Sequence, residues 1–250
     1  MSEAPTQTVP TPAPARRSPR DWPWENWVPA TGIAFVVLVV ITFFLPPKAP
    51  PKAKDLQDSI AAYFSDHRTA ILIAAYLAGI ALILFIWFVA ILARRLRDAG
   101  EPRLGATVLV AGAATLGVAA VSDTIITTLS WRIADDADAD TVKAIFEVQS
   151  GLMTRIWFPI AALILAVAAA EWRSQLRPLW YVAGSLAITL FLLVTAAAWA
   201  REGFFSPTGV PSMPFIAIIL FLIWVLVTSV LLLRERGVLT RTPTPAAAQA

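Results

Sequence analysis

Cysteine is absent from the chain, and histidine occurs only once, at His67. Without cysteine there can be no disulfide, no thiolate nucleophile and no thiolate metal site. A single histidine also leaves too few groups for a histidine-rich zinc site or for a nucleophile activated by a histidine base. We therefore expect no metal ion and no other cofactor.

Recognisable catalytic motifs are lacking as well. The chain contains no HExxH, no glycine loop ending in Lys followed by Ser or Thr, and no GxSxG. Charge is scarce, because charged residues make up 15% of the sequence whereas hydrophobic residues make up 58%, well outside the composition of a soluble domain. Basic and aromatic residues do not alternate along any binding face, so nucleic acid is not expected as a partner.

Long apolar stretches are what the sequence has instead. Six uncharged runs follow one another, separated by short polar segments: Asn26–Pro47, Thr69–Ala93, Leu104–Ser122, Ile156–Ala170, Pro178–Ala200 and Gly203–Leu233. A helix needs about 20 apolar residues to cross a hydrocarbon core of ~30 Å. We therefore predict an all-α membrane protein, a bundle of six transmembrane helices.

The predicted domain organisation follows from these runs. The spans lie near 28–45, 69–93, 104–130, 152–171, 178–200 and 212–233, inside a transmembrane domain of residues 21–236. Residues 1–20 and 237–250 are rich in Pro, Thr and Ala without apolar periodicity, which predicts disordered tails. The stretch Asp21–Pro29, with three tryptophans and two prolines, is typical of a segment lying at the membrane surface.

Cationic residues indicate the orientation. Twelve of the 20 Lys and Arg fall on one side of the predicted spans, in the two tails and in the second and fourth connections. Because such residues are retained in the cytoplasm during insertion, we predict a multi-pass protein of the cytoplasmic (inner) membrane with both termini cytoplasmic. The lipid bilayer is the expected partner, and other membrane proteins are a further candidate.

The first external connection has the pattern of a surface helix. Within Lys54–Arg68, four apolar residues recur at helical spacing with charges on the opposite face, so we predict an external interfacial helix there: Leu56, Ile60, Tyr63 and Phe64. His67 lies where this helix meets the second span, and it is either a pH-sensing group or a solvated interfacial side chain. With Arg68 and Thr127 it forms a predicted outer polar site.

The second external connection is rich in aspartate. The spacing from Asp136 to Glu147 follows a calcium-loop register, but Thr141 stands where that loop needs glycine. The favoured interpretation is a solvated loop in which Asp140 caps a helix beginning near Thr141. No metal ion is predicted here.

Asp123 is the main candidate site residue inside the membrane. A carboxylate at that depth is costly and usually faces the bundle interior with a partner. Small residues, Gly105 and Gly112 among them, share its helix face, which predicts an inward orientation. We predict an ion pair between Asp123 and Arg155, which either fixes the helix register or borders an outward-facing polar vestibule with the neighbouring threonines.

Two segments resemble a group of uncharacterised integral membrane proteins common in actinobacteria. They are YFSDHRTAILIAAYLAGIALILFIWFVAILARRLRDAG (Tyr63–Gly100) and AEWRSQLRPLWYVAGSL (Ala170–Leu186). The resemblance covers roughly Asp55 to Leu233, and this chain departs from the family's usual Leu-Pro order at Arg177-Pro178. The resemblance implies a six-helix bundle and no particular activity.

The sequence leaves the function open among three classes. We expect a non-enzymatic structural or regulatory membrane component, with a small-molecule or ion permease as the alternative and a membrane enzyme as the third. Weak matches between the two halves, such as Trp27-x-Pro29 and Trp157-x-Pro159, leave an inverted repeat of three helices open.

Overall fold

The computed structural model describes residues 28–47, 51–52, 54–175, 177–197, 199–200, 203–208 and 212–239. Within these residues all regular secondary structure is helical, which confirms the predicted all-α class. The elements are α1 (Ala30–Phe44), α2 (Gln57–Asp66), α3 (Arg68–Asp98), α4 (Pro102–Thr128), a π-helical turn η2 (Leu129–Ile133), α5 (Ala134–Asp136), α6 (Ala139–Arg155), α7 (Trp157–Ser174), α8 (Leu179–Thr195) and α9 (Met213–Leu239).

Four helical segments among the described residues are long and apolar enough to cross a membrane: Arg68–Asp98, Pro102–Asp136, Ala139–Ser174 and Met213–Glu235. The other two predicted spans are the apolar but shorter helices Ala30–Phe44 and Leu179–Thr195. By length and composition the helices indicate a membrane location. The predicted 1–20 tail and most of the 21–29 segment lie outside the described residues, whereas α9 continues three residues into the predicted 237–250 tail.

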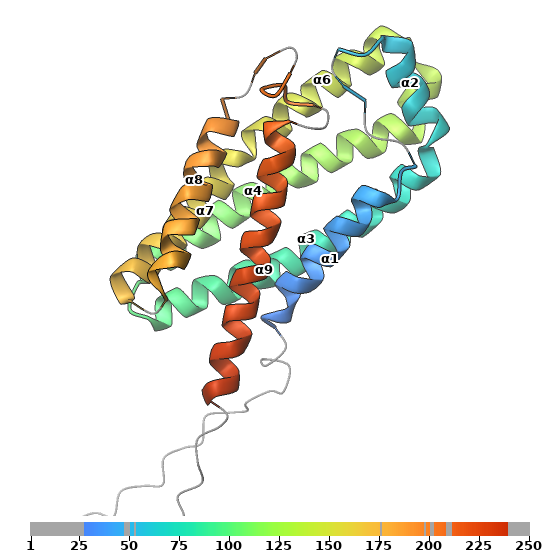
Figure 1. Cartoon of the computed structure of the whole chain (residues 1–250). Helices are drawn as coiled ribbons and strands as arrows, with labels where there is room; N and C mark the ends of the chain where they lie inside the picture. Colours follow the sequence, from blue (N-terminus) through green and yellow to red (C-terminus); the bar gives the residue numbers. More distant parts are fainter. Residues whose placement is uncertain are drawn as a thin grey trace, which may run out of the picture.

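Successive long helices run back and forth along one axis of the molecule (Figure 1). α3 packs between α1 and α4, and α7 packs between α4 and α8. α9 contacts both α1 and α8, so it joins the two sides of the bundle. The start of α1 and the end of α9 both lie in the lower part of the view in Figure 1.

Small residues allow α4 to approach α3 closely. A Cβ atom added at Gly105 would lie 2.7 Å from the Ala93 carbonyl oxygen, and one added at Gly112 would collide with Val89. The predicted small-residue face of α4 is therefore a helix contact, as expected where packing rather than water drives association. Next to it, three fully buried side chains of α3 form part of the main core: Phe85, Phe88 and Leu92.

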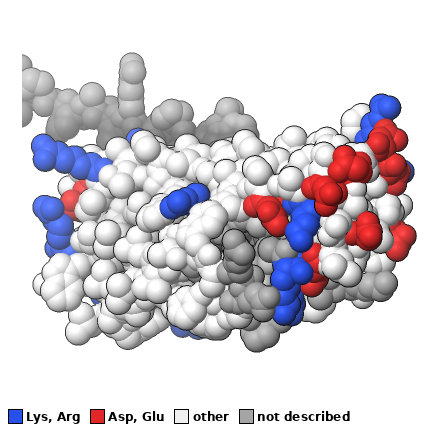
Figure 2. Space-filling view, turned by 90° about the horizontal axis from the view of Figure 1, so that it is seen from above, with Lys and Arg blue, Asp and Glu red and all other residues white. Residues whose placement is uncertain are grey.

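One end of the molecule carries most of the carboxylates, as Figure 2 shows. There α2 packs on α6 and η2, with Ile60 and Phe64 buried against Val142 and Phe146 in a second, smaller core. The predicted surface helix exists, but Ile60 and Phe64 face protein because α6 begins well before the predicted span 152–171 and covers them. We call this part of the molecule, with α2, η2, α5 and the start of α6, the acidic end.

The helix cap at the acidic end differs from the predicted one. Asp138, not Asp140, caps α6, and it accepts hydrogen bonds from the Thr141 amide at 2.9 Å and from the Thr141 hydroxyl at 2.8 Å. Asp138 has the extended backbone that a cap needs, whereas Asp140 already lies in the first helical turn. These two hydrogen bonds lower the pKa of the Asp138 carboxyl below its ordinary value.

The opposite end, which we call the basic end, contains a buried ion cluster. The Glu171 carboxylate on α7 lies 3.0 Å from Arg95 of α3 and 3.3 Å from Arg177, which precedes α8. Glu235 of α9 lies 3.1 Å from Arg95 and 3.3 Å from Arg177. The side chains of Glu171 and Arg177 are only 2% and 1% exposed. The cluster therefore connects α3, α7, α9 and the turn between α7 and α8 inside the protein.

Candidate functional site: an apolar cavity beside Asp123

A cavity of about 510 Å³ lies in the part of the bundle nearer the acidic end. Its walls come from α1, α2, α3, α4, α6, α7 and α9, and most of the lining side chains are apolar. This volume is within the range of small-molecule sites in proteins. It is the larger of the two cavities that we describe.

Small side chains make the space. α3 presents three alanines to the cavity, one helical turn apart or adjacent: Ala74, Ala75 and Ala78. Across from them, α4 contributes Leu116 and Ala119, and the α6–α7 segment contributes Met153 and Ile160. Because alanine side chains are short, they leave space between α3 and the α6–α7 segment, both of which α4 contacts.

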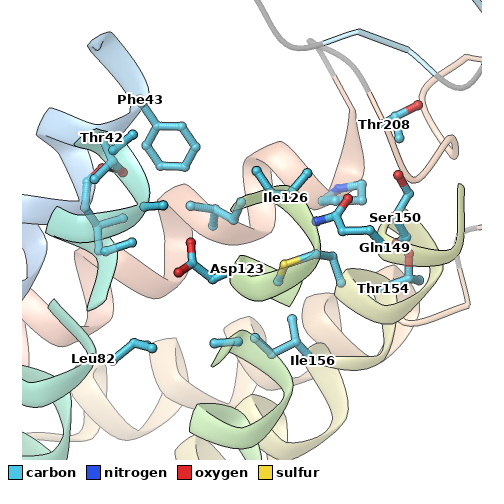
Figure 3. A pocket seen from close by; sticks show the side chains of 18 of the residues that line it. Thr42, Phe43, Leu82, Asp123, Ile126, Gln149, Ser150, Thr154, Ile156 and Thr208 are labelled. Atoms are coloured by element: carbon cyan, nitrogen blue, oxygen red, sulfur yellow. Dashed lines mark hydrogen bonds between the residues drawn. The ribbon is translucent and has the colours of Figure 1, made fainter. Parts of the chain in front are cut away.

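Asp123 is the charged residue of this cavity. Its carboxylate points from α4 into the space between the two sides, as Figure 3 shows. Among the residues that the structure describes, none donates a hydrogen bond to this carboxylate or pairs with it. The predicted inward orientation of Asp123 therefore holds, and the carboxylate is left available to a molecule in the cavity.

Polar groups of α6 line the same cavity (Figure 3). Gln149 Nε2 donates to the Ser122 hydroxyl oxygen at 2.8 Å. The hydroxyls of Ser150 and Thr154 donate to carbonyls of their own helix, at 2.8 and 3.0 Å. With their single protons used in this way, the Ser150 and Thr154 hydroxyls present acceptor oxygens to the cavity, whereas Gln149 keeps an acceptor oxygen and one further amide proton.

Two hydrogen-bond donors complete the lining. Trp157 is 3% exposed and lines the cavity, and its buried indole Nε1 makes no hydrogen bond with any described residue. Tyr63 lines the cavity from α2, outside the spans, and burial raises the pKa of its phenol above the ordinary value. The phenol therefore remains protonated at neutral pH and able to donate.

The predicted ion pair between Asp123 and Arg155 is not formed in the structure. Both residues belong to the described part of the chain, and no ion pair joins them there. The Arg155 guanidinium instead lies over the ring of Trp199, 5.0 Å from its centroid, and 5.9 Å from that of Phe158. Arg155 is the last residue of α6 and exposed, so it reaches the aromatic groups at the bundle surface while Asp123 faces the interior.

Within the described residues, no hydrogen bond or ion pair joins the three members of the predicted outer polar site, His67, Arg68 and Thr127. Arg68 forms an ion pair with Asp135, and its Nε donates to the Ser130 carbonyl at 2.9 Å. The His67 ring stands edge-on to Tyr63, with centroids 5.2 Å apart. Thr127 donates to the carbonyl of Asp123 at 2.7 Å.

These contacts give the three residues separate structural roles. Arg68 connects the start of α3 to the π-helical turn. His67 is the residue between α2 and α3 and contacts Tyr63, and the Thr127 hydroxyl donates a hydrogen bond within its own helix. Of the predicted polar vestibule around Asp123 and the threonines that follow it, only Asp123 lines the cavity. The vestibule is therefore replaced by a mainly apolar cavity.

Sequence reasoning missed several residues of this site. Gln149 and Trp157 stand 27 and 34 positions beyond the Ser122–Asp123 pair, and nothing in a single sequence shows that α6 and α7 bring them there. A clue was available in Gln149 and Ser150, two polar residues a few positions before the fourth apolar run, Ile156–Ala170. Within the described residues there is no group of three or more His, Asp or Glu side chains that could hold a metal ion.

No family model, curated protein or solved structure matches this chain. The resemblance to uncharacterised actinobacterial membrane proteins therefore stays a prediction.

Proposed function

We propose that this protein binds a mainly apolar small molecule in the cavity beside Asp123 and acts as a non-enzymatic permease for it. The observation that carries the proposal is a cavity of about 510 Å³ with a mainly apolar wall and one carboxylate, Asp123, that no described residue pairs with. A bundle with a purely structural role would be expected to fill such a space with side chains, because protein interiors are close-packed. The cavity thus favours the permease over the structural or regulatory component.

The lining indicates the chemistry of the ligand. Asp123 and the acceptor oxygens of Gln149, Ser150 and Thr154 suit a cationic or hydrogen-bond-donating head group. The apolar wall suits an aliphatic or aromatic body, which the hydrophobic effect would hold at roughly 25 cal/mol per Å² buried. An amphiphilic amine has both features. A bare inorganic ion would gain no binding free energy from contact with the apolar surface.

The proposal includes six crossings of the bacterial cytoplasmic membrane with both termini inside. α1 and α8 have 15 and 17 residues, which gives lengths of about 22 and 26 Å, somewhat short of ~30 Å. Each packs beside a longer helix, α3 and α7 respectively, and the bilayer can thin locally around a short span. The cationic bias supports the orientation. A reporter fused after Arg95 should read cytoplasmic and one inserted at Asp138 external; the reverse would contradict it.

Ligand retention tests the binding function. Ala78→Phe places a ring in the cavity, whereas Ala90→Phe adds the same ring to an exposed position on the same helix. Wild type and both variants would be purified in mild detergent, extracted with organic solvent and compared by mass spectrometry. We expect a molecule that wild type and Ala90→Phe retain and Ala78→Phe loses.

Asp123→Asn then tests the head group. It keeps the shape of the side chain and removes the charge, so retention of a cationic ligand should fall about tenfold or more, the effect of losing a charge-assisted hydrogen bond of ~1.5–3 kcal/mol. Equal extracts from Ala78→Phe and Ala90→Phe would mean that the cavity does not hold a ligand.

A further inference from the structure

A second cavity lies at the basic end, on the turn between α7 and α8. It has a volume of about 320 Å³ and is lined by Glu171, Trp172, Gln175, Arg177, Leu179 and Val182. Gln175 ends α7 with a left-handed backbone, φ 51°, and this turns the chain so that Arg177 points back under α7 toward Glu171. Trp172 and Leu179 are exposed at the protein surface, so the cavity adjoins the lipid-facing side of the turn.

Buried polar atoms of opposite character remain without a hydrogen bond at this cavity. Glu171 Oε2 accepts no hydrogen bond from any described residue, and Arg177 Nη1 donates none. Arg177 Nη2 lies 3.3 Å from Glu235 Oε1 in an ion pair, but it too donates no hydrogen bond within the described residues. Glu171 Oε1 is already engaged, because Arg95 and Arg177 Nε both approach it, at 3.0 and 3.3 Å. Leaving such groups unsatisfied inside a protein costs ~1–3 kcal/mol each, and more when they are charged.

A ligand that satisfies both residues must carry an acceptor and a donor close together. Arg177 offers a planar pair of N–H donors, the arrangement that binds phosphate oxygens. Glu171 Oε2 needs an N–H or O–H donor, since a carboxylate only accepts. A phosphate bearing a nearby primary ammonium group fulfils both requirements.

We propose that this cavity binds the headgroup of a phosphatidylethanolamine-type lipid, with its phosphate on Arg177 and its ammonium on Glu171. Trp172 and Trp180, both exposed at this turn, belong to the residue type that gathers at the lipid headgroup level. Basic pockets between transmembrane helices on the cytoplasmic side commonly hold lipid headgroups. The acyl chains would lie along the exposed Leu179 side of α8.

The same geometry discriminates among headgroups. A choline headgroup has the phosphate but no N–H, so Glu171 Oε2 would stay unsatisfied. A glycerol headgroup has hydroxyls but no cation, so it offers Glu171 Oε2 only a neutral donor, which forms a weaker hydrogen bond than an ammonium does. A soluble ester such as glycerophosphoethanolamine has the headgroup chemistry but no chains to pack against Leu179.

Thermal stabilisation of the purified full chain in a maltoside detergent tests the proposal. The probes are dihexanoyl phosphatidylethanolamine, phosphatidylcholine and phosphatidylglycerol, together with glycerophosphoethanolamine. Wild type should bind the ethanolamine lipid at least tenfold more tightly than the other two lipids. Binding of glycerophosphoethanolamine as tight as that of the lipid would overturn the assignment to a membrane lipid.

The variants separate this site from general lipid contact. Trp172→Ala changes the cavity wall, and Trp180→Ala removes an equally exposed tryptophan that does not line the cavity. We expect several-fold weaker binding in Trp172→Ala and no change in Trp180→Ala. Arg177→Lys keeps the charge but loses the two parallel donors, so it should abolish the preference for ethanolamine.

Three further results would overturn the proposal: equal affinity for the three lipids, equal losses in the two tryptophan variants, or an unchanged preference in Arg177→Lys. If Arg177→Lys does not fold, the tryptophan pair and the lipid series still decide. The cavity beside Asp123 plays no part in these measurements, so they test this site independently of the permease.

Discussion

Glu171 should be the most costly carboxylate in the protein to remove. Its side chain is 2% exposed and lies within 3.3 Å of two guanidinium groups. Glu171→Ala would leave Arg177, itself 1% exposed, with only the 41% exposed Glu235 as a counter-charge. Removing one partner of a buried ion pair typically costs about 3–5 kcal/mol.

Glu235→Ala is the matched control. It removes the same charge from the same cluster, but solvent reaches Glu235 and weakens its attraction, so we expect a loss of about 1 kcal/mol or less. The free energy of unfolding would be measured for both variants by equilibrium unfolding in mixed detergent micelles. The double variant Glu171→Leu with Arg177→Met should recover much of the loss, because an apolar pair can replace a buried ion pair at little cost.

The reasoning about the cluster would be refuted by a Glu171→Ala variant within about 1 kcal/mol of wild type. It would also be refuted by equal losses in the two single variants. Either result would mean that water enters the cluster and screens Glu171 as it screens Glu235.

Three further predictions concern packing, capping and the site. Gly32→Ala should lose about 1–3 kcal/mol of unfolding free energy, because its Cβ would collide with side chains of α3 and α9, whereas Gly117→Ala, which has open space, should lose nothing; equal effects would contradict this. Asp138→Ala should melt at a lower temperature than wild type at pH 7. Because the folded-state pKa of the Asp138 carboxyl is lowered, this difference in melting temperature should be full above about pH 4, the ordinary aspartate pKa, and should close as the pH falls through the lowered value. A difference that persists in acid would contradict the prediction. The losses in Asp123→Ala and Arg155→Ala should add within about 0.5 kcal/mol in the double variant, since the structure does not pair them, and a larger coupling measured in the same unfolding assay would restore the ion pair.

Much of the fold could be predicted from hydrophobic periodicity. The six apolar runs correspond to α1, α3, α4, α7, α8 and α9, because an apolar run of this length has no other stable form in a membrane. The extension of α6 beyond the spans could not be seen in the same way. Its apolar residues, such as Val142 and Phe146, cover α2 rather than lipid, and that depends on a tertiary contact.

The candidate site was predictable only in its central residue. Asp123 could be placed facing inward because a lone carboxylate in an apolar helix has few alternatives. Its pairing could not, since Arg155 stands at the very end of α6 and its guanidinium lies over Trp199, a contact that depends on tertiary structure. Glu171 and Arg177 were overlooked as partners because six residues separate them across a turn whose left-handed Gln175 is not apparent from sequence.

A crystal structure of the protein grown from a lipidic mesophase would test the central claim, ligand binding beside Asp123, most directly. We expect continuous density for a mainly apolar molecule in the 510 Å³ cavity, with its polar group within hydrogen-bonding distance of the Asp123 carboxylate. A bundle in which α3 and α6 have closed together and side chains fill this space would contradict the claim.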